Sequence, residues 1–179
     1  MNSKSSPPGG RRLSRRTALA LAAGGALTLA TRAGDWPQWR GPRRDGHAAP
    51  DEPLPDRLPD DWPPVWTRPA GGGFASPVIA GDRVYFADEQ AGEEALHCLD
   101  LASGRPVWSR AYAPSFADEF GSGPRCTPVV GDEAVIVQSC RGELRVLDRA
   151  TGEVRWGRSF ERDYQVAFVG GADSSDAAA

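Results

Sequence analysis

The sequence contains little of what marks several common protein classes. Among 179 residues there are three cysteines, one lysine and 8% aromatic residues. No Cys-x-x-Cys pair occurs, so neither a redox-active dithiol nor a zinc knuckle is indicated. The longest apolar stretch, residues 18–30, is too short to cross a bilayer as a helix of the mature chain. The composition excludes collagen, a coiled coil and a wholly disordered polymer, and the length allows one ordinary domain.

Residues 1–33 have the composition of an export signal. They contain no acidic residue, six basic residues, the apolar stretch, and small residues at Thr31 and Ala33. Arg15 and Arg16 lie in the run Ser14-Arg15-Arg16-Thr17-Ala18-Leu19, which resembles the twin-arginine export motif. The alternative is an uncleaved helix that anchors the chain to a membrane. We predict an exported protein, periplasmic or extracellular, with no membrane span in its mature chain.

Removal of this signal makes the chain strongly acidic. Without residues 1–33 it keeps all 24 acidic residues but only 15 basic ones, a net charge of about −9. Binding to nucleic acid requires clustered basic residues that displace counterions from phosphates. Binding to anionic lipid requires a polybasic segment. We therefore predict no nucleic-acid partner.

Residues 34–70 form a proline-rich arm that is also rich in tryptophan. The arm holds nine of the 16 prolines, so neither a helix nor a central strand is expected there. Disordered linkers are poor in aromatic residues, yet this arm contains four of the six tryptophans: Trp36, Trp39, Trp62 and Trp66. We predict an extended arm whose tryptophan side chains pack on a folded body. A sticky, unfolded leader is the alternative.

Residues 71–165 show short β patterns in two sets. Val, Ile, Tyr, Phe, Leu and Trp dominate them, and Gly-Asp or Ser/Thr-Gly pairs separate them. The first set is residues 75–80, 83–88, 95–100 and 106–111, and the second is residues 126–130, 134–139, 143–148 and 154–159. No helical period of useful length follows the signal. Residues 166–179 read as a low-complexity tail.

The two sets are one repeat that occurs twice. The matching segments are Ser76-Pro77-Val78 with Thr127-Pro128-Val129, Gly81-Asp82 with Gly131-Asp132, and the run Asp100 to Trp108 with the run Asp148 to Trp156. Four short strands at a period near 48 residues are typical of a β-propeller blade. Each Gly-Asp pair is expected to make a tight turn with positive φ. We predict an all-β fold with about two four-stranded blades of an incomplete propeller.

The repeat carries a recognisable motif. The pattern Asp-x-x-[Ser/Thr]-Gly-x-x-x-Trp resembles the tryptophan-docking motif of pyrroloquinoline-quinone-like (PQQ-like) propellers, and the segment from Asp35 to Gly46 is similar to the mature N-terminus of exported bacterial propellers in that superfamily. In that superfamily the motif has a structural role and is not a catalytic set. The resemblance implies that six residues lock neighbouring blades: Asp100, Gly104, Trp108, Asp148, Gly152 and Trp156.

Closed propellers need about four to eight blades, and this sequence shows two. We expect an N-terminal fragment or a truncated reading frame. Two blades leave unpaired strand edges and one uncovered apolar face. Further blades or other protein partners are therefore expected, and self-association is possible.

The resemblance implies an exported propeller repeat protein that acts as a non-catalytic binding or scaffold module. Two alternatives stay open: a fragment of a periplasmic quinoprotein (PQQ-dependent) oxidoreductase, or a non-functional truncated product. Such an oxidoreductase needs a quinone pocket and a Ca²⁺ site built from oxygen ligands, and no acidic cluster has calcium-loop spacing. We predict no catalytic, cofactor-binding or metal-binding residue, and no cofactor.

The histidines and cysteines give weaker signals. His97 takes the position of Arg145 in the second repeat, so we predict that it lies on a solvated strand face. His47 lies in the arm without a second ligand at metal-binding spacing. An odd cysteine count leaves at least one thiol unpaired within the chain. Cys126 and Cys140 could meet across a hairpin and leave Cys98 over, but spacing alone does not fix their geometry.

Overall fold

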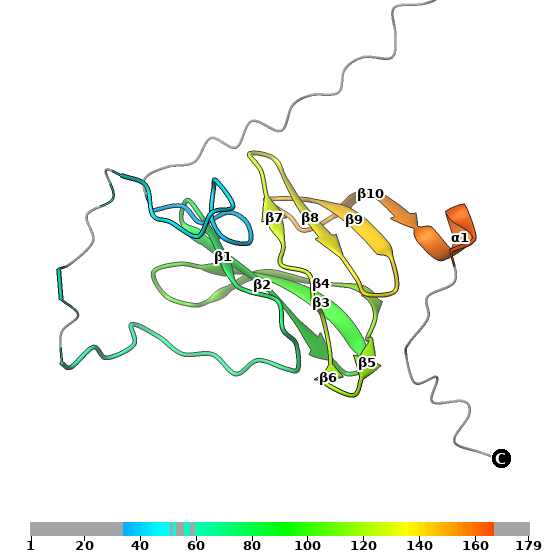
Figure 1. The fold of residues 1–179 in the computed structure, drawn as a ribbon, viewed down its shortest axis with the longest axis horizontal. Helices are drawn as coiled ribbons and strands as arrows, with labels where there is room; N and C mark the ends of the chain where they lie inside the picture. Colours follow the sequence, from blue (N-terminus) through cyan, green and yellow to red (C-terminus); the bar gives the residue numbers. More distant parts are fainter. Residues whose placement is uncertain (1–33, 51, 53–55, 58–59, 167–179) are drawn as a thin grey trace, which may run out of the picture.

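Two four-stranded antiparallel sheets form the body of the molecule (Figure 1). The structure, a computed structural model, describes residues 34–50, 52, 56–57 and 60–166. The first sheet has the order β1-β2-β3-β4, with β1 (Val78–Ala80), β2 (Arg83–Gln90), β3 (Glu93–Asp100) and β4 (Pro106–Pro114). The second sheet has the order β7-β8-β9-β10, with β7 (Val129–Val130), β8 (Ala134–Gln138), β9 (Glu143–Asp148) and β10 (Val154–Ser159).

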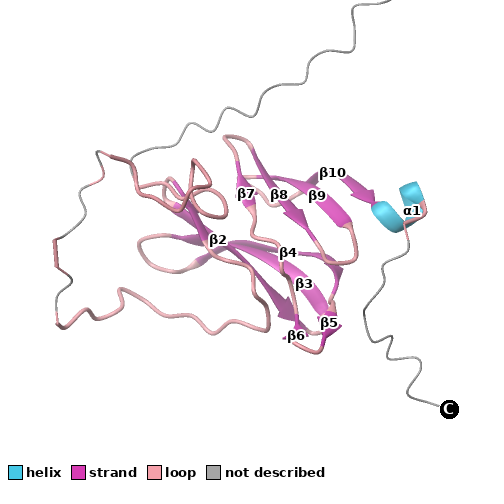
Figure 2. Cartoon of the chain, in the orientation of Figure 1, coloured by secondary structure: helices cyan, strands magenta, loops and turns pink. Residues whose placement is uncertain are grey.

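The predicted all-β fold and its two four-stranded units are confirmed. Each of the eight expected strands is present, with ends displaced by a few residues. Two elements were not expected. A small hairpin of β5 (Ala117–Asp118) and β6 (Gly121–Ser122) joins the sheets, and a single helical turn, α1 (Phe160–Tyr164), follows β10 (Figure 2). The Ser159 hydroxyl caps this turn by accepting from the Arg162 N–H.

One of the three sequence matches between the sheets, that of the Gly-Asp pairs, differs from the structural register by one residue. Leu101 N–H donates to the Asp82 carbonyl, and the equivalent bond in the second sheet joins Arg149 N–H to Glu133. The Gly81-Asp82 turn therefore corresponds to Asp132-Glu133. The predicted match to Gly131-Asp132 was wrong: Gly81 has φ +62°, whereas Gly131 lacks a positive φ and pairs its N–H with the Ala134 carbonyl.

The hydrophobic core lies between the two sheets. From the first sheet it takes Tyr85, Leu96, Cys98 and Trp108 among others, and from the second Val130, Val135, Val137 and Leu147. The Tyr85 and Trp108 rings pack with centroids 5.9 Å apart. Because each sheet alone would expose this face, the two sheets stabilise each other by removing apolar surface from water.

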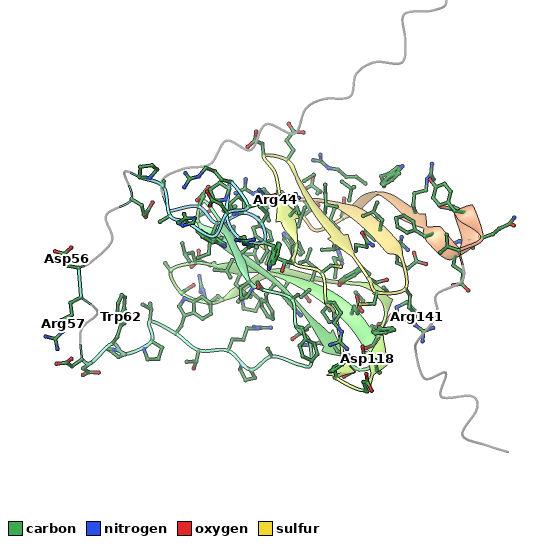
Figure 3. All side chains as sticks on the ribbon, in the orientation of Figure 1. Arg44, Asp56, Arg57, Trp62, Asp118 and Arg141 are labelled. Atoms are coloured by element: carbon green, nitrogen blue, oxygen red, sulfur yellow. The ribbon has the colours of Figure 1, made fainter. Side chains whose placement is uncertain are left out.

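The start of the arm extends the sheet edges. Trp36 and Ile79 exchange two backbone hydrogen bonds of 2.8 and 3.0 Å, and Val130 N–H donates to the Pro37 carbonyl. The arm thus contacts the first strand of each sheet, as Figure 1 shows beside β1 and β7. The packing expected of all four arm tryptophans was wrong for two of them, because Trp39 and Trp62 are exposed. Trp62 stands away from the sheets in Figure 3.

Some predictions fall outside the described residues. The export signal with Arg15 and Arg16 lies there, as does the tail from residue 167 onward. Within the described part of the chain, no helix has the length and apolar character needed to cross a membrane.

Candidate functional site

Each sheet carries one Asp-to-Gly turn of the same construction. In the first, Asp100 Oδ1 accepts from Ser103 N–H (2.9 Å) and Ser103 Oγ (2.6 Å), and Gly104 closes the turn with φ +69°. In the second, Asp148 Oδ1 accepts from Ala150 and Thr151 N–H at 2.8 and 2.9 Å, and Gly152 has φ +71°. We call residues 100–104 the Gly104 turn and residues 148–152 the Gly152 turn.

The turn carboxylates are held in their ionised form. Hydrogen bonds from Arg155 and from the Thr151 amide lower the pKa of Asp148 to about 2. Bonds from Ser103 lower the pKa of Asp100 in the same direction. Each aspartate therefore fixes its turn as a charged acceptor at neutral pH.

Trp108 on β4 of the first sheet docks on the Gly152 turn of the second. Its Nε1–H donates to the Arg149 carbonyl at 3.1 Å. A Cβ built on Gly152 would lie 2.6 Å from Trp108 Cε3, so only glycine lets the ring lie flat on this turn. Trp108 and the Gly152 turn belong to different repeats, so this docked pair joins the two sheets to each other.

The Gly104 turn receives a tryptophan that the sequence reasoning left in the arm. Trp66 Nε1–H donates to the Leu101 carbonyl at 2.8 Å, and a Cβ on Gly104 would meet Trp66 Cδ2 at 2.6 Å. A sequence signal for this role exists. Pro64-Val65-Trp66-Thr67-Arg68 repeats Pro106-Val107-Trp108-Ser109-Arg110 almost residue for residue.

The sixth motif residue has no turn to dock on among the described residues. Trp156 on β10 is 45% exposed, and its ring is contacted by the Arg158 guanidinium, 5.2 Å from the ring centroid. Val154, on the same strand, is also exposed. The structure thus joins Trp66 to Gly104 and Trp108 to Gly152, and it leaves Trp156 open on the last strand of the second sheet.

A cleft of about 530 Å³ opens between the two sheets at the end that carries these turns. Arg149 reaches across it: its guanidinium donates to Tyr85 Oη (3.2 Å) and to the carbonyls of Ala80 (2.9 Å) and Gly131 (3.2 Å). Burial raises the pKa of Tyr85 to about 12, so its phenol is neutral. The lining residues are Asp82, Arg83, Tyr85, Asp132, Glu133, Asp148, Arg149, Ala150 and Arg155. Such a lining suits charged or hydrogen-bonding groups.

The first sheet contains a buried relay of three side chains. His97 Nε2 lies 2.7 Å from Asp88 Oδ1, and His97 Nδ1 lies 2.8 Å from Ser109 Oγ. The prediction of a solvated His97 was wrong, because the residue is only 2% exposed and stacks on Phe86. Asp88 Oδ2 also accepts from Gly71 N–H at 2.8 Å. The relay joins β2, β3 and β4 and binds Gly71, the residue that follows the arm, to them.

A histidine between a carboxylate and a serine also occurs in nucleophilic enzymes, which further need donors for an oxyanion and a substrate pocket. The cleft between the sheets is lined by none of the three relay residues. In the described residues, no group of three or more His, Cys, Asp or Glu side chains is placed to hold a metal ion. We interpret the relay as a connection between strands.

Paired four-stranded sheets, each with a glycine turn that receives a tryptophan from the preceding unit, define the class of PQQ-like propeller repeat proteins. A family model described as outer membrane protein assembly factor BamB matches residues 60–175. The chain belongs to this family. The search of curated proteins finds no match.

Three solved structures each match about half of this chain. BamB from Moraxella catarrhalis is 27% identical with a TM-score of 0.40, over 53% of this chain and 26% of that one. Quinohemoprotein alcohol dehydrogenase from Comamonas testosteroni is 21% identical (TM-score 0.41; 52% and 14% covered). A europium-containing methanol dehydrogenase is 12% identical (TM-score 0.33; 51% and 25% covered). The chain thus spans about a quarter or less of each of these proteins.

Proposed function

We propose that this protein is an exported, non-catalytic binding module that joins other proteins or further propeller blades through the edge of its second sheet. Membership of the assembly-factor family supports a role in protein–protein contact. The acidic charge of the chain after residue 33 supports protein partners over nucleic acid.

The observation that carries the proposal is the state of Trp156. Two tryptophans of the same repeat pattern, Trp66 and Trp108, lie on glycine turns with their indole N–H groups bonded to carbonyls. Trp156 has the place on β10 that Trp108 has on β4, but it is exposed beside Val154. Its chemistry fits a turn of the type Asp-x-x-[Ser/Thr]-Gly, from a further blade or a second molecule.

Sedimentation equilibrium of the full chain over micromolar concentrations tests this surface. We expect a weight-average mass that rises with concentration, and we expect Trp156→Ala to abolish the rise. Trp62→Ala is the matched control, since Trp62 is 61% exposed and docks on no described turn. A concentration-independent monomer mass, or equal effects of the two substitutions, would contradict the proposal.

Titration with pyrroloquinoline quinone and Ca²⁺ tests the non-catalytic part. A binding module should give no shift of the quinone absorbance and no Ca²⁺-dependent protection from protease. A saturable shift together with protection would favour an oxidoreductase. Export is tested separately: a reporter fused to residues 1–33 should reach the periplasm, and Arg15→Lys with Arg16→Lys should retain it in the cytoplasm.

A further inference from the structure

The end of the molecule opposite the cleft buries an acidic side chain without a partner. Glu94, close to the β2–β3 turn, is fully buried, and neither oxygen of its carboxyl group has a hydrogen-bond partner. The hydroxyl of Tyr112 is also buried without a partner. A buried polar group without a partner is costly, and a buried charge is far more so. The cost of this arrangement therefore depends on whether Glu94 carries a charge.

The strand geometry directs Glu94 toward the second sheet. Successive side chains of a strand point to opposite faces, so Glu94 shares its face with Leu96, which belongs to the core between the sheets. Glu94 pairs with Ala113 of β4, and the next residue of β3 pairs with Ala111. Tyr112 is thus the extra residue of a β-bulge opposite Glu94. The carboxyl lies at the end of the inter-sheet core, beside this tyrosine.

The residue opposite Glu94 on β2 is a second acid, Glu89. The Glu89 carboxylate accepts from the Ser122 hydroxyl (2.6 Å) and from the Gly92 N–H (3.2 Å). Residues directly opposite each other in an antiparallel pair project from the same face with Cβ atoms about 5 Å apart, and like charges there repel. A negative charge on Glu94 would therefore face the charge of Glu89.

The other titratable groups around Glu94 come from the connection between the sheets and from the second sheet. Arg125 is the cation that acts on Glu94 among the described residues, but its guanidinium already donates to Asp118 Oδ1 at 2.6 Å. The thiols of Cys126 and Cys140 are free, and burial followed by the charge of Glu94 raises the pKa of each. These neutral thiols cannot compensate a buried negative charge.

Burial decides which form of the carboxyl is favoured. It raises the pKa of Glu94, whereas the Tyr112 phenol, the Phe116 amide and Arg125 favour the ionised form without completing a hydrogen bond to it. Burial raises the pKa of Tyr112 as well, so the phenol is neutral. A carboxyl group in these surroundings keeps its proton.

We propose that Glu94 is protonated in the folded protein at neutral pH, and that its ionisation at higher pH opens the end of the sheet pair opposite the cleft. The carboxyl group releases its proton to the solvent, and water reaches the resulting charge only when the Tyr112 bulge and the connection around Arg125 move apart. The other end, where Trp108 docks on the Gly152 turn, stays closed. This device does not involve Trp156, so it is independent of the proposed binding function.

Urea unfolding between pH 5 and pH 9 tests the charge state. A carboxyl whose pKa is raised on folding contributes stability that is present below its ordinary pKa of 4.5 and is lost as the pH rises through the folded pKa. The urea midpoint of the wild type should therefore fall with rising pH, and Glu94→Gln should remove this part of the fall. Glu93→Gln is the matched control, because Glu93 is the exposed neighbour on the same strand, and it should keep the wild-type profile. Equal profiles of the wild type and Glu94→Gln would overturn the proposal.

A titration of the wild type keeps the proposal testable if Glu94→Gln does not fold. The carboxyl carbon of Glu94, followed by ¹³C NMR, should titrate above the ordinary 4.5. Tyr112→Phe keeps the ring but removes a group that favours the ionised form, so it should move the midpoint to still higher pH. A midpoint at or below 4.5, or a downward shift in Tyr112→Phe, would contradict the proposal.

Limited trypsin digestion locates the opening. Arg125 and Arg141 lie at this end of the sheet pair, and cleavage after them should become faster between pH 6 and pH 9 as the end opens. Cleavage after Arg57, whose side chain is 81% exposed, corrects for the pH dependence of trypsin itself. The ratio of the two rates should rise several-fold in the wild type and stay constant in Glu94→Gln. A constant ratio in the wild type would show that this end stays closed when Glu94 ionises.

Discussion

The two sheets are built from one repeat but differ inside it. Both keep the aspartate, the left-handed glycine and the tryptophan of the docking motif. The first sheet has β2 and β3 strands of eight residues and the buried relay Asp88–His97–Ser109. In the second sheet the equivalent strands have five and six residues, and the relay positions hold Ser139, Arg145 and Gly157. The docking contacts therefore define the unit, and the interior polar contacts vary between units.

In the second sheet Gly157 leaves space for Arg145, which connects strands in place of the relay. Arg145 donates from Nη1 to the Arg158 carbonyl at 3.0 Å, across β9 and β10. A Cβ on Gly157 would lie 2.9 Å from Arg145 Cδ, so the long side chain occupies the space above this glycine. One arginine thus connects two strands where His97 connects three.

The largest difference between the two sheets is expected when the motif tryptophan of each sheet, Trp108 or Trp156, is replaced by alanine. Trp108→Ala removes a buried ring and its bond to Arg149, and it should lower the free energy of unfolding by about 3–5 kcal/mol. Trp156→Ala removes an exposed ring and should cost less than about 1 kcal/mol at low protein concentration. Urea unfolding of both variants measures the difference. Equal losses would show that docking does not join the sheets.

The docking glycine should give the next largest effect. Gly152→Ala forces a Cβ into the Trp108 ring at a left-handed φ and should cost about 2–3 kcal/mol. Gly92→Ala is the matched control, because Gly92 has φ +84° but no atom within 4 Å of the added Cβ. It should cost about 1 kcal/mol from backbone strain alone. Similar losses would mean that the clash with Trp108 is unimportant.

The relay distinguishes the interiors of the two sheets. His97→Ala leaves Asp88 buried without its histidine and should cost about 2 kcal/mol. Arg145→Ala, at the equivalent position, should cost about 1 kcal/mol or less because the arginine is partly solvated. Chemical denaturation of each variant checks this order. A larger loss for Arg145→Ala would reverse our account of the relay.

The smallest expected effect is a pH dependence that the two turn aspartates share. The folded pKa of Asp148 is about 2, below its ordinary 3.8, so its contribution to stability is present above pH 4 and is lost as the pH falls toward 2. Asp148→Asn should flatten this part of the stability profile, measured by thermal unfolding from pH 2 to pH 5. Asp100→Asn should act in the same direction, since the pKa of Asp100 is also lowered. A steeper profile in either variant would contradict the assignment.

The sequence was sufficient for the elements whose determinants are local. Alternating apolar residues and glycine turns located the eight strands, and the spacing from Asp100 to Trp108 identified the docking motif. It failed where partners meet only through register. Asp88, His97 and Ser109 become neighbours only when β2, β3 and β4 align. The hydrophobic periodicity of these strands also gives no sign that Gly71 contacts Asp88.

Trp66 shows a different reason for failure. Its prolines indicated an arm, and that expectation hid its match to the segment around Trp108. The hairpin β5–β6 was missed because it lacks a run of β-branched residues. The sequence around each tryptophan also could not show which turn it docks on, because each tryptophan contacts the turn of the following unit.

Exchange of the indole N–H protons tests the central claim that docked tryptophans lock each unit to the next. In a dilute sample followed by NMR, the Nε1–H of Trp66 and Trp108 should exchange slowly, because each donates to a backbone carbonyl. Those of Trp62 and Trp156 should exchange freely, and only Trp156 should gain protection as the protein concentration rises. Fast exchange at Trp108, or protection of Trp156 equal to that of Trp108 in the dilute monomer, would contradict the account.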